Sequence, residues 1–291
     1  MTRKKICQKF FSFCRVAVLC LIFVFPVFAQ QKIAVLIPDK SLQSQTLTPK
    51  LKIFLTQNFK TLDDSLSEAA FSSVTYENPF NLSLREAKNV GAAIGCDYFL
   101  LLKAQSLRRY SFEKKEFYES FAAVFVISSR SGRLVFWKLV SFEAENSSEA
   151  EKKLLNSASD LSAEISQKLK TDAKEESNGK SADNFESLPD ENSPEAKDFR
   201  PPLPYKRIRP EYTKIANLYS VEATVDIEID VDETGKVARA EIVRWAGFGL
   251  DESVTETVRK MNWRPAERNG KTLPVRVLLR YNFKKIAPDE K

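Results

Sequence analysis

The sequence predicts an α+β protein with two folded domains, and three observations support this prediction. Between residues 30 and 170, short apolar runs alternate with segments whose apolar residues recur at helical spacing. Residues 171–200 are polar and acidic. From residue 201 onward, apolar and polar residues alternate as in half-buried strands. We therefore expect an export segment at residues 1–29, an α/β domain at 30–170, a flexible linker at 171–200 and a second domain at 201–287.

The first 29 residues have the pattern of a secretory signal. They carry five basic residues and no acidic ones, an unbroken apolar run occupies residues 16–28, and Val27 and Ala29 precede Gln30. The run is shorter than the roughly 20 apolar residues that span a bilayer. The alternative is an uncleaved inner-membrane anchor at residues 10–29, with Arg15 reaching back to the membrane surface. The sequence thus predicts a periplasmic protein, or one that is anchored in the inner membrane.

Charge and composition exclude several functions. Outside residues 1–29 the chain carries 40 basic and 39 acidic residues, so we expect no basic surface for a phosphate backbone and no nucleic-acid binding. Histidine is absent, which excludes Ser-His-Asp and Cys-His catalysis and histidine-ligated zinc. Cys96 is the one cysteine outside the export segment, so the mature chain cannot form an internal disulfide. We expect no enzymatic activity, no metal and no cofactor, with a carboxylate-driven hydrolase as the alternative.

The first domain is expected to have the element order β-α-β-α-β-β-β-α. Apolar runs and alternation predict strands at residues 33–38, 71–76, 97–103, 117–128 and 134–144. Helices are predicted to begin at Thr48-Pro49, at the capping box Ser83-x-x-Glu86 and at Ser147, the last of them ending near Lys170. This order implies a small mixed sheet with helices packed on it.

Three short motifs of the first domain recur in a known group of proteins. They are the apolar run at residues 33–38, the helix–strand junction at 92–100 and the hairpin around Ser131-Gly132. Together they resemble the N-terminal α/β domain of TolB-type outer-membrane-assembly proteins, over residues 32–170. The resemblance implies an envelope protein whose first domain has its own partner.

The linker is predicted from composition alone. Residues 171–200 include nine acidic residues and three lysines, but few large apolar side chains. Such a segment cannot bury enough apolar surface to fold by itself. The proline-rich residues 201–204 would stiffen its end.

The second domain is predicted to have the order β-β-α-β. Residues 223–231 alternate, a turn follows at 232–235, and residues 236–244 return as a second strand. A helical stripe begins at Leu250, with acidic Asp251 and Glu252 in its first turn. After a turn at Asn269-Gly270, residues 273–283 alternate again. One helix would then cover one face of a three-stranded antiparallel sheet.

Several motifs of this second domain occur in the order of a known family. They lie at residues 232–237, 242–243, 250–254, 263–266 and 269–275, and at Phe283. Over about residues 202–285 the chain resembles the C-terminal domain of the TonB family. The resemblance implies docking on an outer-membrane transporter or other envelope protein by β-strand addition, possible homodimerisation, and energy transduction by inner-membrane motor proteins if the N-terminus is uncleaved.

The resemblance places partner contacts on two segments, the last strand at residues 276–283 and the segment 210–216 before the first strand. Its candidate partner-binding residues are Tyr212, Arg276, Arg280 and Asn282. The chain departs from the family in having no proline after Tyr212, a signal-like leader and a short acidic linker. These departures leave a periplasmic scaffold without motor coupling as the alternative function.

Charged residues of the second domain allow more than one interpretation. Acidic side chains alternate along one strand, at Asp226, Glu228, Asp230 and Asp232. We interpret them as a solvated face rather than calcium ligands or a catalytic pair, because such side chains diverge and no glycine-rich calcium loop accompanies them. Arg276 and Arg280 could steer an acidic partner, or they could be edge-strand charges that discourage aggregation. Both alternatives remain open at the level of sequence.

Overall fold

The computed structural model describes residues 30–113, 115–178, 185–190 and 192–285. The predicted signal or anchor at residues 1–29 lies outside this range. From Gln31 onward the described residues form one compact unit. None of the helices in the described ranges combines the length and the apolar character needed to cross a bilayer.

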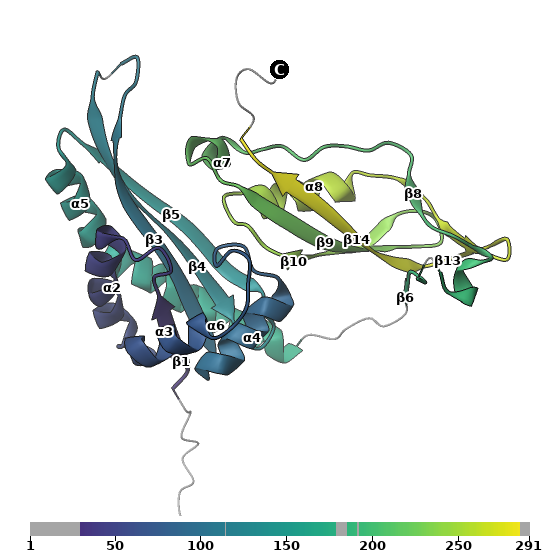
Figure 1. The fold of residues 1–291 in the computed structure, drawn as a ribbon, viewed down its shortest axis with the longest axis horizontal. Helices are drawn as coiled ribbons and strands as arrows, with labels where there is room; N and C mark the ends of the chain where they lie inside the picture. The colour runs from purple at the N-terminus through teal and green to yellow at the C-terminus, as the bar shows by residue number, and fades with distance from the viewer. Residues whose placement is uncertain (1–29, 114, 179–184, 191, 286–291) are drawn as a thin grey trace, which may run out of the picture. The chain divides into compact units, whose positions relative to one another are not determined.

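A five-stranded mixed sheet forms the first half of the fold. Its strands are β1 (Lys32–Leu36), β2 (Lys60–Thr61), β3 (Tyr98–Arg109), β4 (Phe117–Ser128) and β5 (Leu134–Ala144). The spatial order is β2-β1-β3-β4-β5, in which β1 runs parallel to β2 and β3, and β3, β4 and β5 are antiparallel. Figure 1 shows these strands with helices packed around them, as the sequence predicts for a mixed sheet.

Helices cover both faces of this sheet. They are α2 (Leu42–Leu55), α3 (Asp64–Ser72), α4 (Leu84–Ile94), α5 (Ser147–Asn156) and α6 (Ala158–Asn178). Apolar side chains of α2, α5 and α6 share one buried cluster with one face of the sheet, while α3 and α4 contribute to the cluster on the opposite face. The predicted capping box of α4 is present, because Ser83 and Glu86 bond to each other's backbone N–H groups.

Three predictions for the first half were wrong. Helix α2 begins at Leu42 rather than near Pro49, because the Ser41 hydroxyl accepts a hydrogen bond from the Ser44 N–H at 3.1 Å. Residues 71–76 form no strand: Phe71 lies near the end of α3, whose N-cap is Asp63. The single helix predicted from Ser147 to Lys170 is two helices, α5 and α6.

The expected flexible linker at residues 171–200 is corrected in part, and its residues 179–184 and 191 lie outside the described residues. Helix α6 continues to Asn178, and the short strands β6 (Glu186–Ser187) and β7 (Phe199–Arg200) pair with strands of the second sheet region. Side chains support this pairing, since Arg268 forms an ion pair with Glu186 at 2.8 Å and lies over the Phe199 ring. Neighbouring strand edges and basic side chains therefore order pieces of a segment whose composition alone predicts no fold.

The second half contains the predicted β-β-α-β unit. Strands β9 (Ala223–Val231), β10 (Val237–Arg244) and β14 (Val275–Phe283) form an antiparallel sheet in the order β10-β9-β14, with β6 parallel at the end of β14. Helix α8 (Leu250–Arg259) buries Leu250, Val254 and Val258 in the same cluster as the inward side chains of β9. The additional elements are α7 (Lys214–Leu218), β8 (Leu203–Pro204), β11 (Trp263–Arg264), β12 (Ala266–Arg268) and β13 (Lys271–Leu273).

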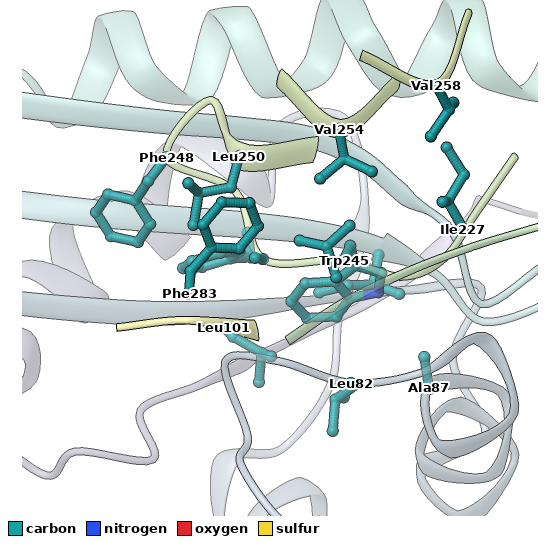
Figure 2. Packing of buried hydrophobic residues seen from close by; sticks show 14 of the residues in the cluster. Leu82, Ala87, Leu101, Ile227, Trp245, Phe248, Leu250, Val254, Val258 and Phe283 are labelled. Atoms are coloured by element: carbon teal, nitrogen blue, oxygen red, sulfur yellow. The ribbon is translucent and has the colours of Figure 1, made fainter. Parts of the chain in front are cut away.

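The two halves share one hydrophobic cluster. Figure 2 shows Leu82 and Leu101 from the first half and Trp245 from the second within it. The buried Asn81 reinforces this contact: its Nδ2 donates to the carbonyl oxygens of Thr224 at 2.8 Å and Trp245 at 2.6 Å, and its Oδ1 accepts from the Thr224 N–H at 2.9 Å. The halves are therefore joined by apolar packing and by hydrogen bonds at a buried amide.

The acidic face of β9 is not solvated, which corrects the interpretation made from the sequence. Asp226 and Asp230 are only 5% and 2% exposed. The antiparallel register places Asp226 directly opposite Arg280, and Asp230 directly opposite Arg276. Each aspartate is therefore buried beneath a paired guanidinium, which compensates for the loss of water around the carboxylate.

Candidate partner-docking edge

Strand β14 has one fully paired edge and one edge that is mostly open. Its pairing with β9 extends from Val275 to Phe283, but its pairing with β6 involves only Val275 and Arg276. Among the described residues, no strand pairs with the other edge of β14 at residues 277–283. An open edge of this kind presents backbone donors and acceptors to an incoming strand.

The alternation of the backbone identifies the outward-directed groups. The Glu186 N–H of β6 donates to the Pro274 carbonyl at 3.2 Å, so residue 274 points its backbone groups away from β9. Because strand backbone groups alternate between the two edges, the N–H and C=O groups of Leu278, Arg280 and Asn282 point to the open edge. The register between β14 and β9 is continuous, so no bulge interrupts this alternation.

An apolar groove borders the open edge on the side of the helix. It has a volume of about 370 Å³, and β14 contributes Val277, Leu279 and Tyr281 to its lining. The opposite wall includes Trp263 and the proline-rich residues 202–204. A strand added at this edge would direct alternate side chains into the groove.

The structure places three of the four predicted site residues side by side on the outer face of β14. Arg276 binds Asp230 through two hydrogen bonds of 2.7 and 3.1 Å, and Arg280 binds Asp226 through two of 2.7 and 2.9 Å. The side chain of Arg280 is nevertheless 60% exposed. The oxygen of the Asn282 amide accepts a hydrogen bond from the Thr224 hydroxyl at 2.8 Å. All three side chains thus stabilise the sheet, and their contact with a partner remains a prediction.

Tyr212, the fourth predicted residue, lies at the far end of the same strand. Its ring stacks on Phe283 with 6.3 Å between the centroids. Its hydroxyl lies 3.1 Å from the Ala216 carbonyl oxygen and 2.9 Å from that of Val221, and burial raises its pKa. Through these contacts, Tyr212 connects the segment before β9 to the end of β14.

Sequence reasoning missed Leu278. This side chain is 55% exposed and lies on the outer face between Arg276 and Arg280. The consecutive pair Leu278-Leu279 breaks the alternation of the strand and was the signal that could have revealed it. An exposed leucine between two arginines gives the open edge an apolar contact point that is flanked by positive charge.

No group of three or more cysteine, aspartate or glutamate side chains in the described residues lies close enough together to hold a metal ion. What the edge offers is directional hydrogen bonding by the backbone, a neighbouring apolar groove and arginine side chains. These are the components of a site that binds an extended polypeptide.

The fold is a small α+β domain in which one edge of a three-stranded antiparallel sheet is mostly open. Residues 208–284 match the family model described as "Gram-negative bacterial TonB protein C-terminal". The match confirms the resemblance drawn from the sequence motifs, and residues 208–284 are a TonB C-terminal domain. The chain therefore contains a TonB-like C-terminal domain. The resemblance of residues 32–170 to TolB-type domains stays a prediction.

Solved structures give weaker likenesses. The TonB C-terminal domain of Pseudomonas aeruginosa is 19% identical, with 34% of this chain and 92% of that chain covered and a TM-score of 0.27. Lipoprotein GNA1162 from Neisseria meningitidis is 13% identical, with coverages of 46% and 99% and a TM-score of 0.32. The LpoB C-terminal domain from Salmonella enterica is 15% identical, with coverages of 40% and 85% and a TM-score of 0.26. At such TM-scores these likenesses carry no argument about fold or function. No curated protein matches the chain significantly.

Proposed function

We propose that this chain is a non-enzymatic binding protein of the periplasm, which docks on an outer-membrane transporter or another envelope protein. The partner supplies an extended segment that adds to the open edge of β14. The observation that carries the proposal is the half-paired state of β14, which is bonded to β9 along its length and to β6 over two residues only.

The geometry of the edge supports an antiparallel or a parallel added strand of several residues. Leu278, Arg280 and Asn282 each offer one N–H and one C=O group in the direction of the added strand. Backbone hydrogen bonds of this kind provide affinity with little dependence on sequence, while pockets for alternate side chains provide specificity. The groove beside Leu279 and Trp263 accommodates apolar side chains of the added strand. On the opposite face of the sheet, the exposed guanidinium of Arg280 favours an acidic side chain of the partner.

A scaffold without motor coupling is the second candidate, and one observation favours it. A transducer needs its docking domain to reach across the periplasm, whereas here the docking domain shares a hydrophobic cluster with the first half of the chain. The Asn81 hydrogen bonds add to this contact. In the scaffold function, the docking edge and the α/β domain present two partners to one another at a fixed spacing.

Peptide titration with edge variants tests docking. Extended peptides from the N-terminal docking segments of outer-membrane transporters are titrated into the chain from Gln30 onward by calorimetry. Leu278→Pro removes an outward N–H that makes no bond to β9, so the sheet should tolerate it. We expect it to weaken peptide binding at least about tenfold, the equivalent of about 1.4 kcal/mol. Leu278→Thr is the matched control, because it keeps the N–H, and it should change affinity less than about threefold, equivalent to under 0.7 kcal/mol.

Circular dichroism and thermal melts establish that both variants retain the fold. Equal binding by Leu278→Pro and by the unaltered chain would contradict strand addition at this edge. The choice between scaffold and transducer follows from the intact mass of the protein recovered from its native envelope. A chain that starts at Gln30 has lost the segment through which a motor could act, whereas a chain that starts at Met1 retains the segment needed for energy transduction.

A further inference from the structure

A hollow of about 310 Å³ lies beside the C-terminal half of β3 and residues 121–125 of β4, and no residue of β14 lines it. Five aromatic side chains contribute to its walls, namely Phe80, Phe121, Phe125, Tyr219 and Phe248. Small side chains, Ala123 and Ala246 among them, leave the space open. Volumes of about 300 Å³ and above are typical of sites for small organic ligands.

Lys103 lines this hollow at the point where one face of β3 changes from buried apolar residues to half-buried polar ones. On the same face of β3, Leu101 is fully buried, and the residue paired with Lys103 across the sheet is Ala123. Lys103 is itself partly buried, and the structure gives it no ion pair or hydrogen bond among the described residues. A partly desolvated ammonium that has no bonded counter-charge can gain a charge-assisted hydrogen bond from an anionic partner.

Further hydrogen-bond donors line the same hollow. Gln105 is the next residue along this face of β3. At Arg109, the last residue of β3, the Nη2 atom is buried and has no hydrogen-bond acceptor. The Nε atom of the same side chain donates to Glu119 at 2.7 Å. Glu119 also accepts from the hydroxyls of Ser141 and Tyr219, so its oxygens are already engaged.

The lining also carries uncharged hydrogen-bond acceptors, on Asn78, Gln105 and Ser220. Glu222 is the acidic residue of the lining, and it is exposed to solvent. The hollow thus combines aromatic and polar walls with the Lys103 ammonium, which has no bonded counter-charge among the described residues. The complementary ligand has a flat or compact apolar body and an anionic acceptor group.

We propose that this hollow binds a small amphipathic carboxylate, with the carboxylate on Lys103 and the apolar body between Phe121 and Phe248. The hollow shares no residue with the groove beside β14. Its walls come from β3 and β4 on one side and from residues 218–223 and 246–248 on the other. A ligand here therefore contacts both halves of the chain and stabilises their association.

Three probes of one shape test the charge preference. 4-Phenylbutyrate, 4-phenylbutanol and 4-phenylbutylamine are titrated into the chain from Gln30 onward by calorimetry. We expect the carboxylate to bind at one site, at least about tenfold more tightly than the alcohol, since a charge-assisted bond is worth roughly that factor. The amine should bind more weakly than the alcohol. Lys103→Gln should bring the acid and the alcohol within about twofold of each other, a difference below about 0.5 kcal/mol.

Two further variants make the test specific. Lys88→Gln changes an exposed lysine on α4 and should leave the preference for the acid intact. Ala123→Leu fills the hollow and should weaken all three probes. Equal binding of acid and alcohol by the unaltered chain, a preference that survives Lys103→Gln, or no binding at millimolar concentrations would each overturn the proposal. None of these outcomes bears on peptide docking at β14, which is measured separately.

Discussion

Replacing Asn81 with alanine tests the contact between the two halves of the chain. The Asn81 side chain is 6% exposed and makes three hydrogen bonds, two to Thr224 and one to Trp245. A buried hydrogen bond contributes about 1 kcal/mol net, and a buried group that loses its partner costs about 1–3 kcal/mol. Asn81→Ala should therefore lower the free energy of unfolding by about 2–4 kcal/mol.

Urea unfolding monitored by tryptophan fluorescence measures this loss. The described tryptophans report on both halves, because Trp137 lies on β5 and Trp245 and Trp263 lie in the second half. Asn89→Ala is the matched control, since Asn89 is exposed on α4, and it should change stability by less than about 0.5 kcal/mol. Asn81→Asp keeps the acceptor for the Thr224 N–H but turns a carboxylate oxygen toward two carbonyl oxygens, so at neutral pH it should destabilise at least as much as alanine.

The result that would refute this reasoning is a loss below about 0.5 kcal/mol for Asn81→Ala, because a buried amide with three bonds cannot be neutral. A second informative feature is the shape of the transition. Loss of the contact should separate the unfolding of the two halves, so the variant should show two transitions or a shallower single one.

Two further predictions concern the second half. Burial raises the pKa of Asp251 to about 7 from an ordinary value of 3.8, against the opposing effect of the Gly247 and Ala246 N–H groups. The folded state therefore binds this proton more tightly, so the stability that Asp251 contributes should be full below pH 4 and decline as the pH rises toward about 7. Asp251→Asn should flatten this decline in urea midpoints that are measured from pH 4 to pH 8. At Gly235, a Cβ would lie 1.8 Å from the Trp263 carbonyl oxygen, whereas at Gly270 it would meet nothing, and both residues have positive φ. Gly270→Ala should cost about 1–2 kcal/mol from backbone strain, and Gly235→Ala at least twice as much. Similar losses in thermal or urea melts would contradict the steric argument.

The candidate site was predictable in part. Alternation at residues 223–231 and 273–283, together with the motifs between them, predicted the sheet, its helix and the strand that carries the open edge. Arg276, Arg280 and Asn282 were correctly placed on one face of that strand. Their bonds to the neighbouring strand could not be predicted, because bonding depends on the register between segments about fifty residues apart.

The sequence by itself indicated most of the local elements and the TonB-like C-terminal domain, while it misplaced the start of α2 and the region of residues 71–76. Periodicity, caps and turn glycines act within a few residues, so they can be recognised along the chain. Tertiary structure alone decided the burial of Asp226 and Asp230, the pairing of residues 186–187 with β14, and the position of Lys103 in an aromatic hollow. Each of these depends on which distant segment lies opposite, and that choice is made by the free energy of the whole fold rather than by local preference.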